Sequence, residues 1–508
     1  GLPQVQGDPT EAALIVAARK AVLDHGETHA REPRQEVIPF ESQHMYMATL
    51  HAGDPRVIFK KGAVDRLLGR CDRMMGADGR EGPLDPAAVH AAVERMGRQG
   101  LRVLALARRH VEADHRGLEH AHVAQGLTFL GLQGMIDPPR PEAIRAVRDC
   151  QSAGIAVKMI TGDHAVTAAA VAGQLGLGRR RPGESVVRAL TGAELEKVPD
   201  ADLPRVAEET DVFARVAPEQ KLRLVQALQA RGHVVAMTGD GVNDAPALKQ
   251  ADIGVAMGIT GTEVAKGAAA MVLLDDNFAS IEAAVEEGRN VFDNLVKFIV
   301  WTLPTNGGEG LLLLTAILLG TQLPVLPVHL LWINMTTAVL LGLMLVFEPK
   351  ESGLMQRPPR DPRQPLLTWP LVMRTGLVSL LMLVGGYGLF LWEQRAHGAS
   401  VAEARTVVVN LIVVAEAFYL FNCRSLTRSF LSLGWFTNRW LWAGLAAMLL
   451  FQLAFNYAPF MNRWFHSEPV RWETWLHVVG AGAAVCLVVE LEKWLRFHGE
   501  RGRHAIPE

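Results

Sequence analysis

One short segment of the sequence combines glycines and acids in an arrangement suited to binding a metal ion beside a phosphate. The apolar run HVVAMTG leads directly into Asp240, and Asn243 and Asp244 follow within the next turn. A carboxylate where a strand of a parallel sheet ends lies at the edge where ligands gather, and Mg²⁺ prefers oxygen ligands. A plain strand-to-turn connection is the alternative for a bare Asp-Gly pair. We expect Asp240 to bind Mg²⁺ while Asn243 and Asp244 hold the loop.

Two further segments could handle a phosphoryl group. The string MITGD ends another apolar run, and Thr161 and Gly162 offer a hydroxyl and a backbone N–H that can hold phosphoryl oxygens, with Asp163 next in the chain. Lys221 follows the turn at Pro218 and could place an ammonium group against developing phosphoryl charge. A lone lysine at a helix start is usually solvated, so this role depends on its neighbours.

Polar residues inside long apolar runs form a third group. Asn306 and Glu309 lie three residues apart, Asn334 and Thr337 repeat that spacing in the next run, and Glu416 lies in the middle of a later run. Residues three apart share one face of a helix. An acid within a membrane span is costly and usually functional, and ligation by oxygen alone selects hard cations. For the Asn and Thr residues, interhelical hydrogen bonding is the alternative role.

The first of these runs also contains Pro304 and the pair Gly307-Gly308. Proline and glycine loosen a helix, so we expect carbonyl oxygens freed here to act as additional cation ligands.

The elements that must position these residues change in kind along the chain. Up to about Gly131 the helical spacing of EAALIVAARKAVLDHG mixes with the alternating segments MYMATLHAG and RVIFKKGA, which predicts an α+β unit. From Leu127 to about Ala284 apolar strands alternate with helices, beginning with LTFLGLQGMI, which predicts a doubly wound parallel sheet of the α/β class. We place the domains at residues 1–131, 132–284 and 285–508.

The last domain is expected to be an all-α membrane domain. After an amphipathic stalk, FASIEAAVEEGRNVFDNLVKF, six apolar segments are long enough to span a bilayer, since each needs about 20 residues. They lie near 295–320, 325–346, 370–392, 404–422, 439–457 and 473–494. Arginines occupy alternate connections, which the positive-inside rule assigns to the cytoplasm, together with the soluble domains and the C-terminus. These arginines are Arg357, Arg360 and Arg363, then Arg424 and Arg428, then Arg496, Arg501 and Arg503.

Composition excludes several other classes. The net charge of −2 and the lack of a basic stripe argue against a nucleic-acid partner. The four cysteines are far apart and form no CxxC pair, which fits a reducing compartment and supports neither a disulfide framework nor a cysteine zinc site. The first residues lack the features of a signal peptide, so we interpret Gly1 as an interior start within a longer protein.

The string TGDGVNDAPAL at residues 238–248 resembles the hinge signature of P-type ATPases, and the other signatures of that family follow in order. They are GDPTEAAL (7–14), KGA (61–63), GLRVLALA (100–107), MIDPPRPE (135–142), MITGD (159–163) and FARVAPEQK (213–221). By this resemblance the chain is identified as similar to the calcium-pump-like branch of that family. The resemblance implies a haloacid-dehalogenase-like phosphorylation domain that lacks its first strand and its nucleophile, a partial nucleotide-binding domain, and ATP and Mg²⁺ as cofactors.

The resemblance also implies roles for single residues. Thr161 and Gly162 would contact the transferred phosphoryl group, Asp163 would lie close to the nucleotide, and Lys221 would face the phosphoryl charge.

Four more residues match nucleotide ligands of the family: Phe40 would stack on adenine, Lys61 would line the same pocket, and Arg102 and Arg215 would reach the ATP phosphates. Met45 stands where the family commonly has a second lysine, so nucleotide affinity is expected to be weaker.

The family nucleophile, an aspartate in Asp-Lys-Thr-Gly-Thr, does not occur in this sequence, nor do the actuator domain and the first four membrane helices. The chain as given is therefore not expected to form an aspartyl-phosphate by itself. We interpret it as the C-terminal part of a pump, with the N-terminal half as an implied partner. A truncated, non-catalytic nucleotide-binding membrane protein is the alternative.

The membrane residues Asn306, Glu309, Asn334, Thr337 and Glu416 resemble the cation ligands of calcium pumps. Ca²⁺ is therefore the favoured cargo, with Mn²⁺, Mg²⁺ and a proton as alternatives. Ala338 stands where the calcium branch has an aspartate, which predicts a weakened or absent calcium site. The expected location is the inner membrane of a bacterium, with the lipid bilayer as a further partner.

Overall fold

The computed structural model describes residues 9–41, 44–136, 138–178 and 187–503, without the side chains of residues 9, 25 and 497–503. Gly7 and Asp8 of GDPTEAAL, Asp137 of MIDPPRPE and the side chains of Arg501 and Arg503 therefore lie outside the described part. The chain divides into two compact units. The first comprises Gly1–Gln151 and Ile155–Glu282, and the second comprises Ser152–Gly154 and Ala283–Glu508.

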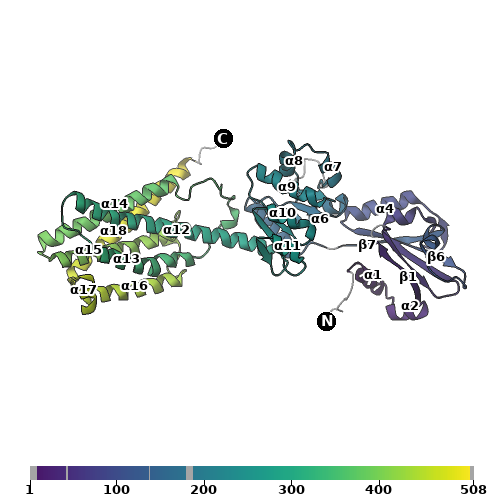
Figure 1. The fold of residues 1–508 in the computed structure, drawn as a ribbon, viewed down its shortest axis with the longest axis horizontal. Helices are drawn as coiled ribbons and strands as arrows, with labels where there is room; N and C mark the ends of the chain where they lie inside the picture. Colours follow the sequence, from purple (N-terminus) through teal and green to yellow (C-terminus); the bar gives the residue numbers. More distant parts are fainter. Residues whose placement is uncertain (1–8, 42–43, 137, 179–186, 504–508) are drawn as a thin grey trace. The chain divides into compact units, whose positions relative to one another are not determined.

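The first unit begins with a seven-stranded sheet in the order β1-β2-β3-β6-β7-β4-β5, antiparallel except where β4 meets β7 (Figure 1). Burial alternates along some of these strands, as expected for a sheet with one buried face. In β2, for example, Tyr46, Ala48 and Leu50 are buried, while the residues between them are only partly buried. The strands are β1 (Arg34–Glu41), β2 (Tyr46–His51), β3 (Arg56–Gly62), β4 (Cys71–Met75), β5 (Glu81–Pro83), β6 (Arg102–Val111) and β7 (Leu127–Met135). The helices are α1 (Pro9–Lys20), α2 (His25–Arg31), α3 (Val64–Leu68), α4 (Pro86–Arg98) and the 3-10 helix η1 (His120–Val123).

Strand β7 corrects one expectation. It was expected to open the parallel sheet, but it pairs antiparallel with β6, with Arg102 opposite Met135 and Ala105 opposite Leu132. Its apolar pattern correctly predicted a strand. The pattern could not show which neighbour the strand would pair with, because pairing depends on a partner that is distant in sequence.

The second part of this unit contains only parallel strand pairs, as expected, but the described strands form two sheets instead of one. One has the order β8-β10-β9 and the other β11-β12-β13, so β8 and β11 are both edge strands. The strands are β8 (Met159–Thr161), β9 (Leu190–Thr191), β10 (Val212–Ala214), β11 (Ala236–Gly239), β12 (Ile253–Met257) and β13 (Met271–Leu273). The helices are α5 (Pro141–Ser152), α6 (Ala165–Leu175), α7 (Gly192–Glu196), α8 (Leu203–Glu209), α9 (Pro218–Ala230), η2 (Val242–Asp244), α10 (Ala245–Gln250) and α11 (Glu263–Ala268). The single expected sheet is split because no described strand pairs with both β8 and β11.

The second unit is helical. Its first helix, α12 (Phe278–Leu318), is 41 residues long and joins the expected stalk to the first expected span without a break. The other helices are α13 (Pro327–Leu340), η3 (Gly342–Phe347), η4 (Leu354–Gln356), α14 (Trp369–Ala396), α15 (Val401–Cys423), η5 (Phe430–Ser432), α16 (Arg439–Tyr457), α17 (Pro459–Phe465) and α18 (Trp472–Arg503).

Within the described residues, five helical segments are long and apolar enough to cross a membrane. They are Pro327–Phe347, Trp369–Ala396, Val401–Cys423, Arg439–Tyr457 and Trp472–Arg496. The expected first span, 295–320, is helical as far as Leu318 but is not among the five, because Asn306, Glu309 and four glycines make it less apolar. The expected count of six therefore becomes five by length and composition.

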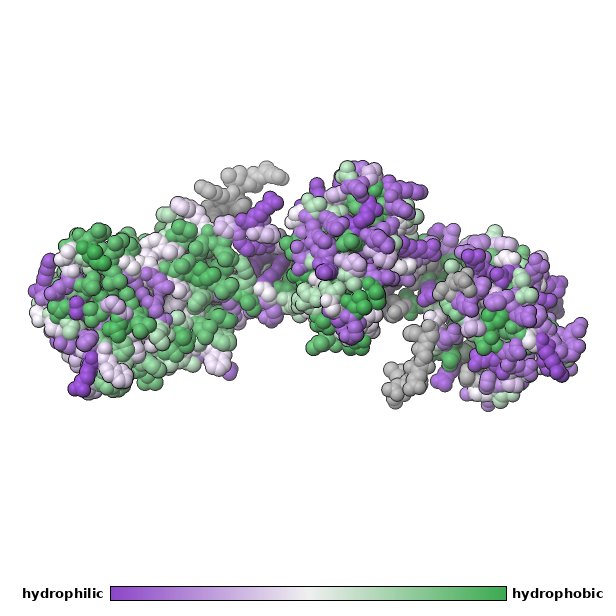
Figure 2. Space-filling model, in the orientation of Figure 1, coloured by the Kyte–Doolittle hydropathy of each residue, from purple (hydrophilic) through white to green (hydrophobic). Residues whose placement is uncertain are grey.

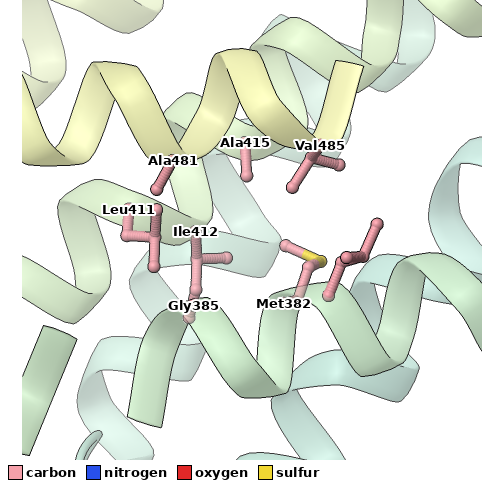
Figure 3. Close-up of a pocket in the computed structure, with 8 residues that line it drawn as sticks. Met382, Gly385, Leu411, Ile412, Ala415, Ala481 and Val485 are labelled. Carbon is pink, nitrogen blue, oxygen red and sulfur yellow. The ribbon is translucent and has the colours of Figure 1, made fainter. Parts of the chain in front are cut away.

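The surface and the core of the helical unit fit a lipid environment. Figure 2 shows that its visible face is mostly apolar, in contrast to the polar surface of the strand-rich unit. Helix α15 is the most buried of the five, with 78% of its most apolar stretch covered, so it forms the centre of the bundle. A cavity of about 20 Å³ between α14, α15 and α18 is lined only by apolar side chains and glycine (Figure 3). It offers no ligand for a cation.

Candidate functional site

The expected phosphoryl-binding residues lie where strands of the two parallel sheets end. Thr161 is the last residue of β8, and Asp240 directly follows β11. The Thr161 hydroxyl accepts a hydrogen bond from the Asp163 backbone N–H (3.1 Å) and lies 3.0 Å from the Asp163 carboxylate. Gly162 and Asp163 are exposed, so the loop is open to a ligand.

Asp244 is the buried centre of the Asp240 loop. Its carboxylate accepts a hydrogen bond from the Lys221 ammonium at 2.6 Å and from the backbone N–H groups of Asp240 (3.3 Å) and Gly241 (3.1 Å). A Cβ on Gly239 would lie only 2.6 Å from the Cβ of Asp244, so this turn requires glycine. The pairing fixes the loop, as expected for Asp244, and it also gives Lys221 a partner that the sequence did not reveal.

The loop fits a hard divalent cation. The Asp240 side chain is exposed, while its backbone carbonyl accepts a hydrogen bond from Thr262 N–H at 2.8 Å. Because Asp244 already neutralises Lys221, Asp240 is the carboxylate available to Mg²⁺, which takes oxygen ligands and usually keeps several waters. Asn243 is exposed beside it. Bound Mg²⁺ would neutralise phosphoryl charge at this place.

A pocket of about 560 Å³ lies on the seven-stranded sheet, a size typical of small-molecule sites. Its walls include Lys61 of β3, whose ammonium is ion-paired with Glu11 of α1, and His29, Met47 and Leu106. Glu11 belongs to the string GDPTEAAL but was not singled out from the sequence. Its contact with Lys61 makes it an additional candidate nucleotide ligand.

The other expected nucleotide residues are not brought into this pocket. Phe40 is 60% exposed on β1, and Arg102 is exposed at the start of β6, where both lie outside the pocket walls. Arg215 follows β10 in the other part of the unit and has a positive φ of 51°. Their roles remain those implied by the resemblance.

The expected cation ligands form a cluster inside the helical unit. Glu309 of α12 and Glu416 of α15 are 4% and 1% exposed. Asn334 of α13 is exposed, but its side-chain N–H donates to Glu309 Oε2 at 2.7 Å, which places it at the edge of the cluster. Glu416 lies near Glu309 and within reach of the hydroxyl of Thr337, which is also buried. Three helices thus bring together four of the five expected residues.

This cluster has unused ligand capacity. Glu309 Oε1 and Glu416 Oε2 are buried and have no hydrogen-bond partner among the described residues. Burying a carboxylate oxygen without a partner is costly, so such atoms are usually completed by an ion or water. The described residues hold no group of three or more His, Cys, Asp and Glu side chains suited to a metal. The cluster instead combines two carboxylates with amide and hydroxyl oxygens.

Two neighbouring residues differ from the expectation. The Asn306 side chain is exposed in the helical unit, although Glu309 on the same helix is buried. Thr305, which the sequence did not single out, is 1% exposed and lies near Glu416, while its hydroxyl donates to the Thr302 carbonyl at 2.9 Å. Asn306 therefore remains a ligand only by resemblance, and Thr305 becomes a candidate.

One carbonyl that Pro304 frees, that of Val300, already has a side-chain partner. Helix α12 continues through Pro304, and the Val300 carbonyl that Pro304 leaves without an intrahelical partner accepts a hydrogen bond from the Tyr419 hydroxyl at 3.0 Å. The neighbouring glycines serve close packing, because a Cβ on Gly308 would lie 2.7 Å from Met382. The expectation that carbonyl oxygens of this segment bind the cation stays a prediction for the other carbonyls.

Comparison with known families agrees with this architecture. Residues 3–142 match the family described as P-type ATPase, cytoplasmic domain N, residues 77–252 match haloacid dehalogenase-like hydrolase, and residues 322–495 match Cation transporting ATPase, C-terminus. The chain belongs to the P-type cation ATPases and is a multi-pass membrane protein.

Several curated proteins are similar over nearly the whole chain. It is 55% identical over 494 residues to Probable cation-transporting ATPase F of Mycobacterium tuberculosis, covering 97% of this chain and 54% of that protein. It is 48% identical over 492 residues to Cation-transporting ATPase pma1 of Synechocystis, covering 95% and 53%. The Calcium-transporting ATPase of Bacillus subtilis is 39% identical over 488 residues, covering 94% and 54%. The chain thus spans about half the length of the curated relatives that it matches.

Proposed function

We propose that this chain, as part of a complete pump, uses ATP to transport a cation across the membrane through an aspartyl-phosphate cycle, and that Ca²⁺ is the favoured cargo. The supporting observation is the buried pair Glu309 and Glu416 with its two unpaired carboxylate oxygens. Asn334 and Thr337 complete a set of oxygen donors that suits a hard cation. Similarity to a Calcium-transporting ATPase adds to this choice.

The same proposal assigns the cofactor sites. ATP would bind in the pocket that contains Lys61, and Mg²⁺ would bind at Asp240. Phe40, Arg102 and Arg215 lie outside the walls of that pocket and are assigned as further ATP ligands by the family resemblance alone. Thr161, Gly162 and Lys221 would hold the phosphoryl oxygens, with Asp163, Asn243 and Asp244 shaping the loops. The soluble domains would lie in the cytoplasm and the helices in the plasma membrane.

Ala338 favours a second candidate cargo. It is partly buried on α13, next to Thr337, and contributes no oxygen ligand. With one fewer carboxylate, the cluster could carry a proton, Mn²⁺ or Mg²⁺ in place of Ca²⁺.

Transport by a full-length pump that contains this sequence tests the proposal. Inverted membrane vesicles would be assayed for ATP-driven ⁴⁵Ca²⁺ uptake and for ATP hydrolysis with Ca²⁺, Mn²⁺ or Mg²⁺ over a range of pH. Glu309→Gln and Glu416→Gln should each lower Ca²⁺-stimulated hydrolysis by at least about tenfold, because each removes a charged ligand.

Glu473→Gln is the matched control, since Glu473 is exposed at the start of α18 and away from the cluster. It should leave uptake unchanged. Hydrolysis that depends on pH but on no metal would point to proton transport. Full Ca²⁺ uptake by Glu309→Gln would contradict the assignment of the cation site.

A further inference from the structure

Pro304 creates a specific problem inside α12. Proline has no backbone N–H, so the carbonyl four residues earlier, that of Val300, loses its helical hydrogen bond. Val300 is fully buried, and an unpaired buried carbonyl destabilises the fold. The helix nevertheless continues for 14 residues beyond this point, to Leu318.

Helix α15 donates one hydrogen bond to α12 at this point and accepts another from it. The Tyr419 hydroxyl donates to the Val300 carbonyl at 3.0 Å, and the Trp301 indole N–H donates to the backbone carbonyl of Glu416 at 3.1 Å. Both aromatic side chains are 1% exposed. Two adjacent residues of α12 are thus bound to two residues of α15 that lie three apart, and one of these is the candidate ligand Glu416.

Helix α14 adds a third bond at the same level. The Ser379 hydroxyl donates to the carbonyl of Pro304 at 2.8 Å and is buried. A Cβ on Gly307 would lie 2.5 Å from this hydroxyl, so the glycine leaves the space that Ser379 occupies. The part of α12 around Pro304 therefore has hydrogen bonds to two other helices, α14 and α15.

We propose that Tyr419 and Trp301 are positioning residues of the cation site, which hold Glu309 and Glu416 in the facing arrangement that a cation requires. We call the two reciprocal bonds the α12–α15 clasp. Two buried carboxylates repel each other when both are charged, so their proximity needs a restraint that does not depend on the ion. Because Trp301 binds the backbone of Glu416 itself, a rotation of α15 that withdrew this carboxylate would break the clasp. This inference rests on the proposed function, since it names how that site is held.

The proposal is tested by combining substitutions at Tyr419 and Pro304. Tyr419→Phe keeps the ring but removes the hydroxyl, leaving the Val300 carbonyl unpaired. Pro304→Ala restores the backbone N–H that can bind this carbonyl within α12. In the full-length pump, Tyr419→Phe should raise the cation concentration for half-maximal ATP hydrolysis roughly tenfold, with the maximal rate changed less than about twofold. In the Pro304→Ala background the same substitution should have little effect.

Tyr457→Phe is the control for loss of a tyrosine hydroxyl away from the cluster. The Tyr457 hydroxyl also donates to a backbone carbonyl at 3.0 Å, that of Val470, although Tyr457 is exposed and accepts a bond from the Trp475 indole N–H. This substitution should leave the half-maximal cation concentration unchanged. Trp301→Phe should raise that concentration by about threefold, because the Glu416 carbonyl can still accept a bond within its own helix.

The same variants are also compared by thermal unfolding in detergent, which does not depend on transport. Tyr419→Phe should lower Tm, and Pro304→Ala in the same chain should restore it. An equal loss of cation affinity with and without Pro304, or the same loss in Tyr457→Phe, would overturn the positioning role. If the unaltered pump shows no cation-stimulated hydrolysis, the proposed function fails. In that case, an unchanged Tm of Tyr419→Phe would overturn the clasp, and a lowered Tm that Pro304→Ala restores would retain it.

Discussion

Lys60 is a buried amine at the pocket that contains Lys61. Its ammonium donates to the Val123 carbonyl at 2.8 Å and lies 3.7 Å from the centre of the Tyr46 ring. Burial, together with the nearby Arg70 guanidinium, lowers the pKa of Lys60 from 10.5 to about 7. At Lys60 the unfolded chain therefore binds more protons than the folded chain between about pH 7 and 10.5, so this group makes the free energy of unfolding rise with pH across that window.

We predict that this rise amounts to roughly 1 kcal/mol per pH unit and disappears in Lys60→Met. The urea midpoint for alkylation of Cys71, which is buried in the same sheet, would be measured by peptide mass spectrometry from pH 7 to pH 9, below the range in which loss of the thiol proton from the unfolded chain opposes the rise. Burial raises the pKa of the Cys71 thiol to about 11, so the folded protein protects it. A similar rise in both proteins would show that Lys60 is not the titrating group.

At the scale of residues, the sequence predicted the positions of the candidate residues along their elements better than it predicted their contacts. Asp240 and Thr161 were expected at strand ends because apolar runs lead directly into them, and the structure places both there. The pairing of Lys221 with Asp244 joins residues 23 apart in the chain. No local pattern encodes such a pair, because it forms only when α9 packs beside the η2 turn.

At the scale of elements, helices of the second unit pack closely where a glycine lies between them. Gly444 of α16 lies against the end of α13, where an added Cβ would be 2.0 Å from the backbone carbonyl of Leu340. Gly376 of α14, by contrast, has nothing within 4 Å of an added Cβ. These two glycines therefore provide a matched pair for measuring how much the unit depends on this helix contact.

We predict that Gly444→Ala lowers the stability of the helical unit by about 1–3 kcal/mol, because the backbones of α13 and α16 must separate. Gly376→Ala should be neutral or slightly stabilising, since alanine favours a helix more than glycine does. Thermal unfolding in detergent, followed by the fluorescence of the tryptophans, would compare the two variants. Equal Tm values would show that α13 and α16 can separate without lowering the stability of the unit.

At the scale of elements, strand and helix types were well predicted and strand partners were not. Strands β2, β3, β8 and β11 lie where alternation or apolar runs placed them. Strand β7 joins the antiparallel sheet, and the parallel strands divide into two sheets. Periodicity reports which face of an element is buried, whereas sheet membership depends on which edges are available in three dimensions.

The arginines that suggested the orientation of the whole molecule have different roles in the structure. Arg424 is 2% exposed and binds Glu348 at 3.0 Å, together with Thr437 and the Gly434 carbonyl. Arg357 is exposed and lies 2.7 Å from Asp293 of α12. Arg424 thus contributes to packing at the helix ends, and the positive-inside argument depends more on the exposed arginines.

We predict that residue 363, between α13 and α14, lies on the cytoplasmic side and that residue 396, at the end of α14, lies outside. Both positions are exposed, so Arg363→Cys and Ala396→Cys can report on them. In intact cells a membrane-impermeant maleimide should label Ala396→Cys but not Arg363→Cys, and both should react after permeabilisation. The native cysteines are buried and provide the background. The reverse pattern would contradict the proposed orientation.

The sequence by itself determined the class of the protein, the kinds of elements and the approximate places of the polar groups within them. These features depend on local order, since an apolar run that ends in Gly-Asp-Gly or an acid within a membrane-length segment can be read directly. Only the tertiary structure showed that Thr305 lies near Glu416 and that Asn306 is exposed. It also showed that the Tyr419 hydroxyl donates to the Val300 carbonyl, which Pro304 leaves without a helical partner. Each of these contacts depends on the rotation and approach of helices far apart in the chain, which side-chain packing sets and a one-dimensional pattern does not contain.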